Sequence, residues 1–285
     1  MTANAVDPHE GVFARERQRE IASLVDANGR ARVSELARRF SVSAVTIRKD
    51  LVTLEGEGRV VRTHGGAIAT RGGGPELAFD IRERLQREEK SHMGVAAAAL
   101  VHDGESIVLD ASTSALYVAR HLKDRLVWHG LTVVTNSIRI ASELAGHQGI
   151  EVLLLGGRVR WEALSVVGPL GDGVFRRVNV QKAFLGAAGF TIEEGLSDAM
   201  EEEAQIKRSM VNAARDVYAV VDRTKWGRIS SATFCRTDRL KGVFTDEGAH
   251  PEMVGTLRAM GVEVVEVGRA STKDIANPRD GRVAT

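Results

Sequence analysis

The stretch Ser41-Val42-Ser43-Ala44-Val45-Thr46-Ile47-Arg48-Lys49-Asp50-Leu51 decides how this chain is organised. It predicts a short turn followed by a helix that reads DNA, because small and hydroxyl-bearing residues precede two cations. Small residues let the backbone approach a groove, while Arg48 and Lys49 meet phosphates and base edges. The predicted DNA contacts of this helix are Ser43, Ala44, Val45, Thr46, Arg48, Lys49 and Thr53.

The sequence on both sides of this stretch predicts a winged helix-turn-helix. Apolar residues spaced between Phe13 and Val25 indicate a first helix with a basic outer face. Residues 34–40 indicate a second helix, with Ser34 as its cap. Residues 59–68 favour β structure and have a glycine tip, which is typical of a wing. The wing adds two predicted DNA contacts, Arg62 and His64.

Positive charge is concentrated in this part of the chain. Residues 15–71 carry twelve basic and seven acidic side chains, whereas the whole chain has a formal net charge of +1. The alternative reading is a small helical domain whose arginines are merely solvated. Because the positive excess coincides with the groove-reading pattern, double-stranded operator DNA is the expected partner.

Length and composition limit the other possibilities. A chain of 285 residues is long enough for two domains, and its one cysteine excludes an intramolecular disulfide. No apolar run has the length of a membrane span and residues 1–10 lack the order of a signal peptide, so a cytoplasmic protein is expected. The predicted parts are a disordered N-terminus (1–12), the DNA-binding domain (13–70), a glycine-rich linker (71–76), an α/β domain (77–270) and a disordered tail (271–285).

Beyond the linker, predicted strands alternate with helices. Residues 79–100 indicate one long helix, and further helices are expected over 115–122 and 201–214. This alternation predicts an α/β domain with a mainly parallel, open and buried sheet. Its predicted strands are 106–109, 132–134, 151–155, 183–185, 217–221, 242–244 and 262–265.

Polar residues and glycines follow most of these strands, at the edge where open α/β sheets bind ligands. Hydroxyls and backbone N–H groups at the start of a helix suit an anion such as phosphate. Asp110 would accept a hydrogen bond from a sugar hydroxyl, and Lys207 or Lys225 would neutralise a phosphate. Each group also has an ordinary structural role open to it, as a helix cap, a turn former or, for Lys225, a surface ion pair.

These motifs resemble the DeoR family of bacterial transcription regulators. In the DNA-binding part the resemblance rests on Val33-Ser34-Glu35-Leu36-Ala37, on residues 42–51 and on Arg62-Thr63-His64-Gly65-Gly66-Ala67. The family typically has arginine at the position of Lys49. This chain therefore keeps the charge there but loses the bidentate geometry of a guanidinium group.

The resemblance extends over the α/β part, to about residue 248. The matching motifs are Leu109-Asp110-Ala111-Ser112-Thr113-Ser114, Thr132-Val133-Val134-Thr135-Asn136-Ser137, Leu155-Gly156-Gly157, Lys182-Ala183-Phe184-Leu185-Gly186, Lys207-Arg208-Ser209-Met210 and Asp222-Arg223-Thr224-Lys225. The resemblance implies a sensor domain similar in fold to ribose-5-phosphate isomerase, with a phosphorylated sugar as effector and no cofactor.

The resemblance also supplies the implied ligand-binding residues. They are Asp110, Ser112, Thr113, Ser114, Thr135, Asn136, Gly156, Gly157, Gln181, Lys207 and Lys225. Two of them depart from the family pattern. Ser112 stands where the family often has glycine, which is expected to tighten the loop. Gln181 stands where the family usually has aspartate, so a hydroxyl contact or charge is expected to be missing and the ligand to be unusual.

Three functions are compatible with this organisation. The resemblance implies a repressor of carbohydrate-metabolism genes that a phosphorylated sugar releases from its operator. A sugar-phosphate isomerase is the enzyme alternative, but it needs a carboxylate base and Gln181 cannot abstract a proton. In a third reading the second domain is only an oligomerisation platform, since homodimers or homotetramers suit palindromic operators. The histidines show no metal-ligand spacing, so no metal is expected.

Overall fold

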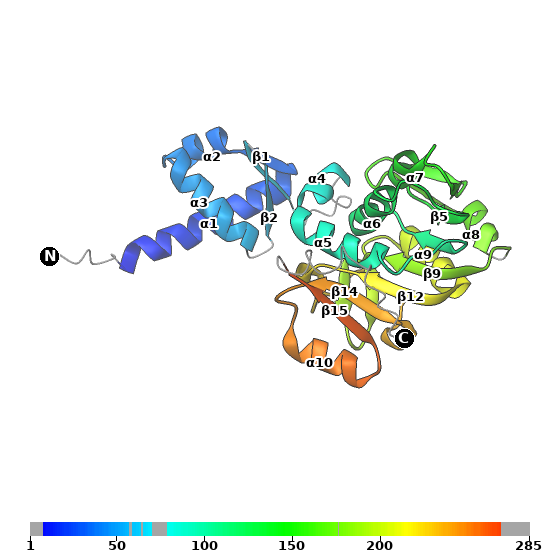
Figure 1. The fold of residues 1–285 in the computed structure, drawn as a ribbon. Helices are drawn as coiled ribbons and strands as arrows, with labels where there is room; N and C mark the ends of the chain where they lie inside the picture. The colour runs from blue at the N-terminus through cyan, green and yellow to red at the C-terminus, as the bar shows by residue number, and fades with distance from the viewer. Residues whose placement is uncertain (1–7, 57–58, 64, 70–78, 176, 269–285) are drawn as a thin grey trace, which may run out of the picture. The chain divides into compact units, whose positions relative to one another are not determined.

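The computed structural model describes residues 8–56, 59–63, 65–69, 79–175 and 177–268 (Figure 1). The chain divides into two compact units, Met1–Leu77 and Ala78–Thr285. The predicted linker and the predicted C-terminal tail lie outside the described residues. No helix within the described ranges is long and apolar enough to cross a membrane.

The N-terminal unit combines three helices with a small antiparallel sheet. Its elements are α1 (Pro8–Asn28), β1 (Arg30–Arg32), α2 (Val33–Arg39), α3 (Ala44–Gly56), β2 (Val60–Thr63) and β3 (Gly66–Ala69). The strand order is β1-β3-β2, so the hairpin of β2 and β3 forms the wing. Apolar side chains from all three helices, among them Ile21, Leu36 and Ile47, share one buried core.

The predicted starts of two helices in this unit, α1 and α2, need correction. α1 begins at Pro8, so residues 8–12, which were expected to be disordered, belong to the helix. Proline suits a helix start because its fixed φ is helical and no N–H is needed there. Ser34 is not a cap but lies inside α2. Arg32, the residue before α2, occupies the N-cap position instead, and its backbone N–H donates to the Glu35 carboxylate at 3.2 Å.

The C-terminal unit is built on a seven-stranded sheet in which all neighbouring strands are parallel. The strands in spatial order are β15 (Glu263–Val267), β14 (Gly242–Asp246), β12 (Ala214–Val220), β9 (Val180–Leu185), β4 (Ser106–Leu109), β5 (Leu131–Thr135) and β6 (Ile150–Leu154). The chain runs outward from β4 to β6 and then returns to β9, on the other side of β4. The junction of β4 and β9 is therefore the topological switch point, and the predicted parallel open sheet is confirmed.

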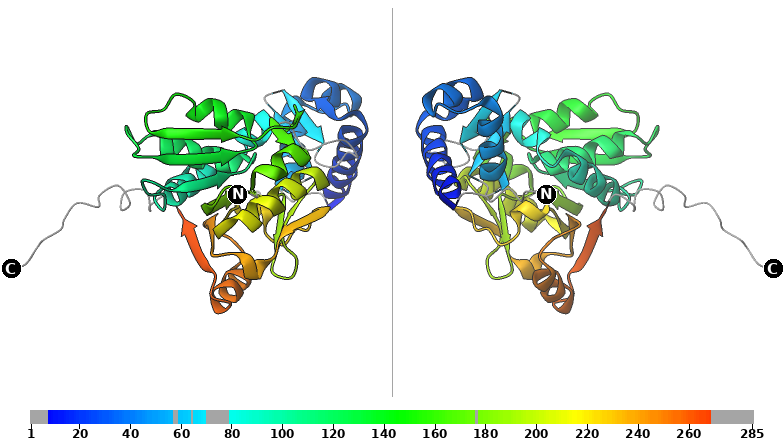
Figure 2. Two further views of the ribbon diagram at one scale, coloured as in Figure 1. Left: turned by 90° about the vertical axis from the view of Figure 1, so that its right-hand side faces the viewer. Right: turned by 90° about the vertical axis from the view of Figure 1, so that its left-hand side faces the viewer.

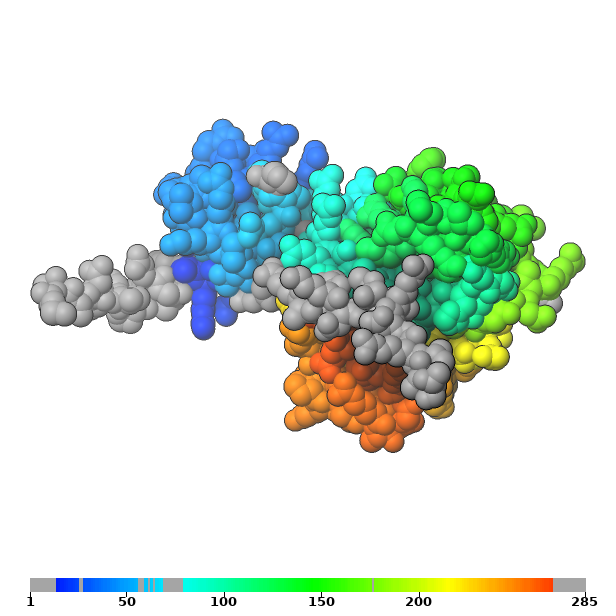
Figure 3. Space-filling model, viewed as in Figure 1, coloured from blue at the N-terminus to red at the C-terminus, as the bar shows by residue number. Residues whose placement is uncertain are grey.

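Helices cover both faces of this sheet (Figure 2). The covering helices are α5 (Arg87–Ala98), α6 (Thr113–Lys123), α7 (Ile138–Leu144), α9 (Glu201–Ala213) and α10 (Pro251–Ala259). Alternation along β4 serves both layers, since Ile107 and Leu109 join the core beneath α5, α6 and α7, while Val108 joins the core beneath α9 and α10. α10 and the edge strand β15 lie together on the surface of this unit (Figure 3, orange).

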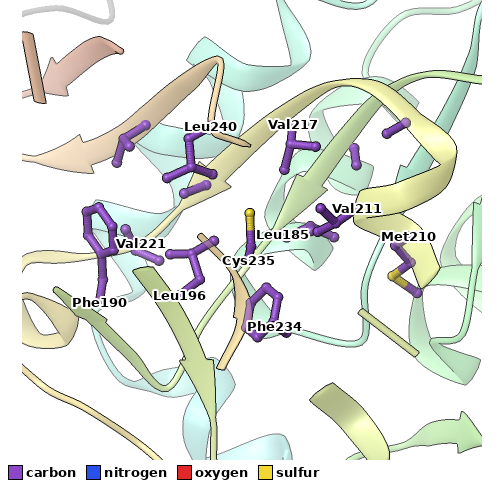
Figure 4. Packing of buried hydrophobic residues seen from close by; sticks show 14 of the residues in the cluster. Leu185, Phe190, Leu196, Met210, Val211, Val217, Val221, Phe234, Cys235 and Leu240 are labelled. Atoms are coloured by element: carbon purple, nitrogen blue, oxygen red, sulfur yellow. The ribbon is translucent and has the colours of Figure 1, made fainter. Parts of the chain in front are cut away.

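Shorter elements that the sequence did not predict complete the unit. They are the hairpin β7 (Arg158–Arg160) and β8 (Ser165–Val167), the helix α8 (Pro169–Phe175), the antiparallel strands β10 (Gly189–Thr191), β11 (Gly195–Asp198) and β13 (Ala232–Cys235), and the 3-10 turns η1 (Arg223–Lys225) and η2 (Thr237–Arg239). Cys235 packs beside Phe234 and Leu196 in the core (Figure 4). Burial raises the pKa of its thiol to about 12, so this cysteine serves as a small apolar side chain.

The single long helix predicted over residues 79–100 is wrong. Two helices occupy this segment, α4 (Phe79–Arg84) and α5, and Gln86 between them has a left-handed φ of 46°. The break is stabilised by Lys90, whose Nζ donates to the carbonyl oxygens of Arg82 and Leu85, each at 2.5 Å. The ammonium group thus satisfies carbonyls that the end of a helix leaves without partners.

Candidate DNA-binding and effector sites

Helix α3 has one buried face and one exposed face. Ile47, Leu51 and Leu54 are buried, because their spacing of four and three residues places them on one side of the helix. The exposed residues are Ser43, Val45, Arg48, Lys49, Val52 and Thr53, while Ala44 and Thr46 are half-buried. All the residues that the sequence predicted as DNA contacts on this helix therefore reach its surface at least in part.

Two of these residues start the helix. The Oγ of Ser43 accepts a hydrogen bond from the backbone N–H of Thr46 at 3.1 Å and lies 2.9 Å from Thr46 Oγ1. Ser43 is thus an N-cap, and both hydroxyls are engaged with each other. Val45, Arg48 and Lys49 are exposed beyond this cap.

The cations of α3 have no ionic partner in the part of the chain that the structure describes. Arg48 and Lys49 form no ion pair with any described residue. The neighbouring Asp50 does not neutralise them, because it is 3 % exposed and faces α1. Its carboxylate accepts from Arg17 Nε at 2.6 Å and from Gln18 Nε2 at 2.9 Å. Asp50 therefore fixes α3 against α1 and leaves the positive charge of α3 to solvent or DNA.

The wing is tied to the same helix. Glu55 of α3 accepts a hydrogen bond from the backbone N–H of Arg62 at 3.2 Å, and its carboxylate lies 3.5 Å from the Arg62 guanidinium. Gly66 allows β3 to pass β1 closely, since a Cβ there would lie 2.1 Å from the carbonyl oxygen of Ala31. Arg62, a predicted DNA contact, thus lies beside α3, whereas His64 falls outside the described residues.

In the C-terminal unit, Asp110 lies at the topological switch point. It follows β4 and has no exposed surface. The backbone N–H of Gly186, which follows β9, donates to both carboxylate oxygens at 3.2 Å, and Ser112 Oγ donates at 2.6 Å. Gly186 is required here because a Cβ would lie 2.5 Å from Ser112. Asp110 therefore joins two strand ends, and it does not present a free carboxylate to a sugar.

Lys207 of α9 completes this buried centre. Its Nζ lies 2.8 Å from Asp110, 2.6 Å from Asp198 and 3.0 Å from the carbonyl oxygen of Gly186. An ammonium group has three donors, so all of them are used. Burial alone disfavours the charge, but Asp110 and Asp198 raise the pKa of Lys207 above its usual range. Lys207 thus organises the strand ends and has no donor left for a phosphate.

The hydroxyls after β4 and β5 divide into two kinds. Ser112 caps α6 by accepting from the backbone N–H of Ala115 at 3.1 Å, and Thr135 Oγ1 accepts from the N–H of Ser137 at 3.0 Å. These two are structural, as the cap reading allowed. Thr113 and Ser114, 6 % and 7 % exposed, form no side-chain hydrogen bond with a described residue. Their hydroxyls remain available at the N-terminus of α6.

Asn136 carries an unsatisfied acceptor at the end of β5. The residue has no exposed surface, and its Nδ2 lies 3.3 Å from both the carbonyl oxygen of Val166 and Glu203 Oε2. Its Oδ1 is buried and has no hydrogen-bond partner among the residues that the structure describes. Glu203 is held by Arg160 at 2.6 Å and by the hydroxyl of Ser165. A buried polar atom without a partner is unfavourable unless a ligand supplies one.

The other predicted ligand residues occupy different positions. Gly156 and Gly157 follow β6 and are exposed, and a Cβ on Gly157 would lie 2.4 Å from the carbonyl oxygen of Val167, so this glycine permits the β7–β8 hairpin. Lys225 is half-buried in η1, after β12. The predicted ligand role of Gln181 is corrected by its position. Its Oε1 accepts a hydrogen bond from the backbone N–H of Ser106 at 2.7 Å, at the start of β4. It therefore lies at the end of the sheet opposite Asp110.

Sequence reasoning missed three charged residues at this site. Asp198 and Glu203 have the partners given above, and Lys90 is 4 % exposed. Burial lowers the pKa of Lys90 to about 8, partly offset by the carboxylate of Asp222 and reinforced by the cation of Lys225. In a chain this rich in Asp, Glu and Lys, the local sequence does not show which charged residues are buried. Across the described ranges, no group of three or more His, Cys, Asp or Glu side chains is arranged to hold a metal.

The two units match known protein families. Residues 17–71 match the DeoR-like helix-turn-helix domain, and residues 85–247 match the DeoR C terminal sensor domain. The HTH-type transcriptional regulator YulB of Bacillus subtilis is 36 % identical over 252 residues, which are 88 % of this chain and 96 % of YulB. The HTH-type transcriptional repressor GlcR of the same species is 32 % identical over 263 residues, which are 92 % of this chain and 100 % of GlcR.

Solved structures also resemble part of the chain. Ribose 5-phosphate isomerase A of Methanocaldococcus jannaschii is similar over 50 % of this chain and 55 % of its own, with 17 % identity and a TM-score of 0.36.

A winged helix-turn-helix joined to an α/β sensor unit defines a DNA-binding transcription regulator. The chain belongs to the DeoR family of such regulators. Since its relatives are named as transcriptional regulators and repressors, the protein is a regulator and the isomerase alternative is not supported.

Proposed function

We propose that this protein represses genes of carbohydrate metabolism and that a phosphorylated sugar releases it from its operator. The observation that carries the effector part is the buried Oδ1 of Asn136 at the carboxyl edge of the sheet, for which the described residues supply no hydrogen-bond partner. A sugar hydroxyl is a donor that would satisfy this atom. The name of the relative GlcR as a transcriptional repressor supports the sign of regulation.

The phosphate of the effector would bind at the N-terminus of α6. Thr113 and Ser114 offer hydroxyls that no described residue occupies, and the first backbone N–H groups of a helix favour an anion. Lys90 and Lys225 would supply positive charge. Burial lowers the pKa of Lys90, which lies in α5, and the cation of Lys225 lowers it further.

The buried centre of Lys207, Asp110 and Asp198 would shape this pocket without touching the phosphate. It joins the ends of β4, β9 and β11 through one ammonium group. This assignment replaces the phosphate role expected for Lys207 and the sugar-hydroxyl role expected for Asp110. Both residues would act as positioning residues, because every donor of the ammonium and both oxygens of Asp110 are already bonded.

Release of DNA would require the effector to prefer the DNA-free arrangement of the protein. Differential binding of about 1–3 kcal/mol is the usual range for such coupling. A homodimer or homotetramer would let two winged helix-turn-helix units read a palindromic operator. The helix α4, whose last carbonyls are held by Lys90, begins at the first described residue after the linker and would carry the change.

Calorimetric titration of the full chain with a panel of phosphorylated sugars tests the pocket. Asn136→Leu keeps the side-chain volume and removes the amide, so it should weaken the effector that binds by about tenfold. Gln181→Met is the matched control, since this amide lies at the opposite end of the sheet. Equal affinity in the two variants would refute the Asn136 assignment. Absence of heat for every sugar phosphate would favour the oligomerisation platform instead.

A further inference from the structure

The N-terminal unit contains a basic hollow that the recognition helix does not account for. The hollow has a volume of about 370 Å³ and is lined by Arg15, Gln18, Arg19, Thr53, Leu54 and Arg59. The three arginines come from two elements, α1 and the segment just before β2. Arg15 and Arg19 are four residues apart and therefore share one face of α1.

The positive charge of this hollow is not neutralised from within the described part of the chain. Arg15, Arg19 and Arg59 form no ion pair and no side-chain hydrogen bond with a described residue. Two carboxylates of α3 are engaged elsewhere, since Asp50 is bound by Arg17 and Gln18 and Glu55 is paired with Arg62. Three guanidinium groups around one hollow suit an anion, and above all a phosphate, whose oxygens accept paired N–H donors.

The position of the hollow indicates which phosphate it would hold. Thr53 lines it and lies one turn after Lys49 on α3, to whose carbonyl oxygen the Thr53 hydroxyl donates at 3.3 Å. The hollow thus adjoins the face of α3 that carries the free cations. Because a water molecule takes up about 30 Å³ of liquid, the space admits a phosphodiester group with some of its water.

We propose that Arg15, Arg19 and Arg59 bind a backbone phosphate of the DNA flanking the bases read by α3. The contact fixes the register of α3 in the groove and carries no sequence information. The proposal rests on DNA binding by the winged helix-turn-helix and adds a second, sequence-independent site to it. None of the three arginines belongs to the contacts that the sequence predicted.

The test compares Arg59→Ala and the double variant Arg15→Ala/Arg19→Ala with the full-length wild type. Binding is measured by fluorescence anisotropy over a range of salt concentrations, with DNA from upstream of the protein's own gene and with an unrelated duplex. Each variant should bind both duplexes about tenfold more weakly. The slope of log K against log salt should become shallower by about 0.9, as expected for the loss of one phosphate contact.

Two controls separate this site from other effects. Arg215→Ala removes one positive charge from a side chain that is 80 % exposed in the sensor unit, and should change neither affinity nor slope. Arg48→Ala should lose mainly the preference for the upstream duplex. Wild-type binding to DNA establishes that the domain itself functions, so failure of the proposal is distinguishable from failure of DNA binding.

Three outcomes would overturn the proposal. One is unchanged affinity and salt slope in both pocket variants. Another is a loss confined to the upstream duplex, which would indicate base contacts. The third concerns a free phosphate ester as occupant: calorimetric binding of inorganic phosphate that Arg59→Ala abolishes, with DNA affinity unchanged, would assign the hollow to a small ligand.

Discussion

The exposed face of α3 and the buried centre of the sensor unit differ in whether their cations have ionic partners. On α3, Arg48 and Lys49 are exposed and have no ionic partner among the described residues. In the sensor unit, Lys207 is 4 % exposed and bonded to Asp110, Asp198 and a carbonyl oxygen. Exposed cations are available to an external polyanion, whereas the buried cation is committed to the fold.

This difference teaches where function should be sought in each unit. In the DNA-binding unit, the proposed DNA contacts are charges that have no ionic partner among the described residues. In the sensor unit, the paired charges hold strand ends together. The proposed effector contacts there are Asn136 Oδ1, which has no hydrogen-bond partner among the described residues, and the hydroxyls of Thr113 and Ser114, which form no side-chain hydrogen bond with a described residue. An exposed charge is available to a binding partner, whereas a buried charge that is paired stabilises the fold.

The largest expected effect follows from removing the buried cation. Lys207→Met leaves Asp110 and Asp198 together without their counter-charge, so the free energy of unfolding should fall by about 3–5 kcal/mol. Urea denaturation measures this loss. The control is Lys182→Met, because Lys182 pairs with Glu105 at the opposite end of the sheet and both are more exposed. Equal losses in the two variants would contradict the claim that the buried centre stabilises the fold more than the more exposed pair of Lys182 and Glu105.

Removing a free cation should leave stability alone and change DNA binding. Arg48→Ala should weaken binding to the operator by about 100-fold, since a bidentate base contact contributes about 1–3 kcal/mol of discrimination. Unfolding should shift by less than about 0.5 kcal/mol, as for other surface changes. Gel retardation and thermal unfolding measure the two quantities. Full operator affinity in this variant would remove α3 from the DNA interface.

The pH dependence of the free energy of unfolding tests the buried cation Lys90, for which an effect of intermediate size is expected. The pKa of Lys90 falls from an ordinary 10.5 to about 8 in the folded protein. Between these values the unfolded chain binds more protons than the folded chain, so stability rises with pH, by at most about 1.4 kcal/mol per pH unit. Below pH 8 both states are protonated and this contribution is constant.

Denaturation of the wild type and of Lys90→Met between pH 7 and 10.5 measures the Lys90 contribution, with the pH range set by the pKa shift. The wild type should gain stability relative to the variant above pH 8. Parallel curves over the whole range would mean that burial does not perturb this lysine.

The smallest effect is expected for the exposed pair of Glu55 and Arg62. Their side chains are 37 % and 40 % exposed, so Glu55→Gln should change the free energy of unfolding by less than about 1 kcal/mol. Thermal unfolding at low and high salt measures this change. A loss as large as that of Lys207→Met would contradict the distinction between exposed and buried pairs.

Local patterns predicted the elements that depend on local interactions. The buried stripe of α3 follows from the spacing of Ile47, Leu51 and Leu54, and the predicted strand Ser106–Leu109 has the bounds of β4. Parallel strands of alternating βα units were predicted for the same reason, since runs of apolar residues and intervening polar turns are visible in sequence.

Elements that depend on distant partners were missed. β11 pairs with β13 more than thirty residues later, and the break between α4 and α5 depends on where the Lys90 ammonium group lies. Asp198 gains its role from contact with Lys207, which no local pattern shows. The ligand role predicted for Gln181 was wrong. Gln181 precedes the predicted strand 183–185, whereas the ligand edge of a parallel sheet follows the strands, so its position in the sequence already argued against this role.

The most direct test of the account is release of DNA by an effector. Labelled DNA from upstream of the protein's own gene is bound by the full chain, and phosphorylated sugars are then titrated into the complex, with the unphosphorylated sugars as controls. One phosphate ester should raise the apparent dissociation constant for DNA by about tenfold or more, and its unphosphorylated sugar should have no effect. If a phosphate ester binds the protein calorimetrically and leaves DNA affinity unchanged, the claim that the sensor unit controls DNA binding is wrong.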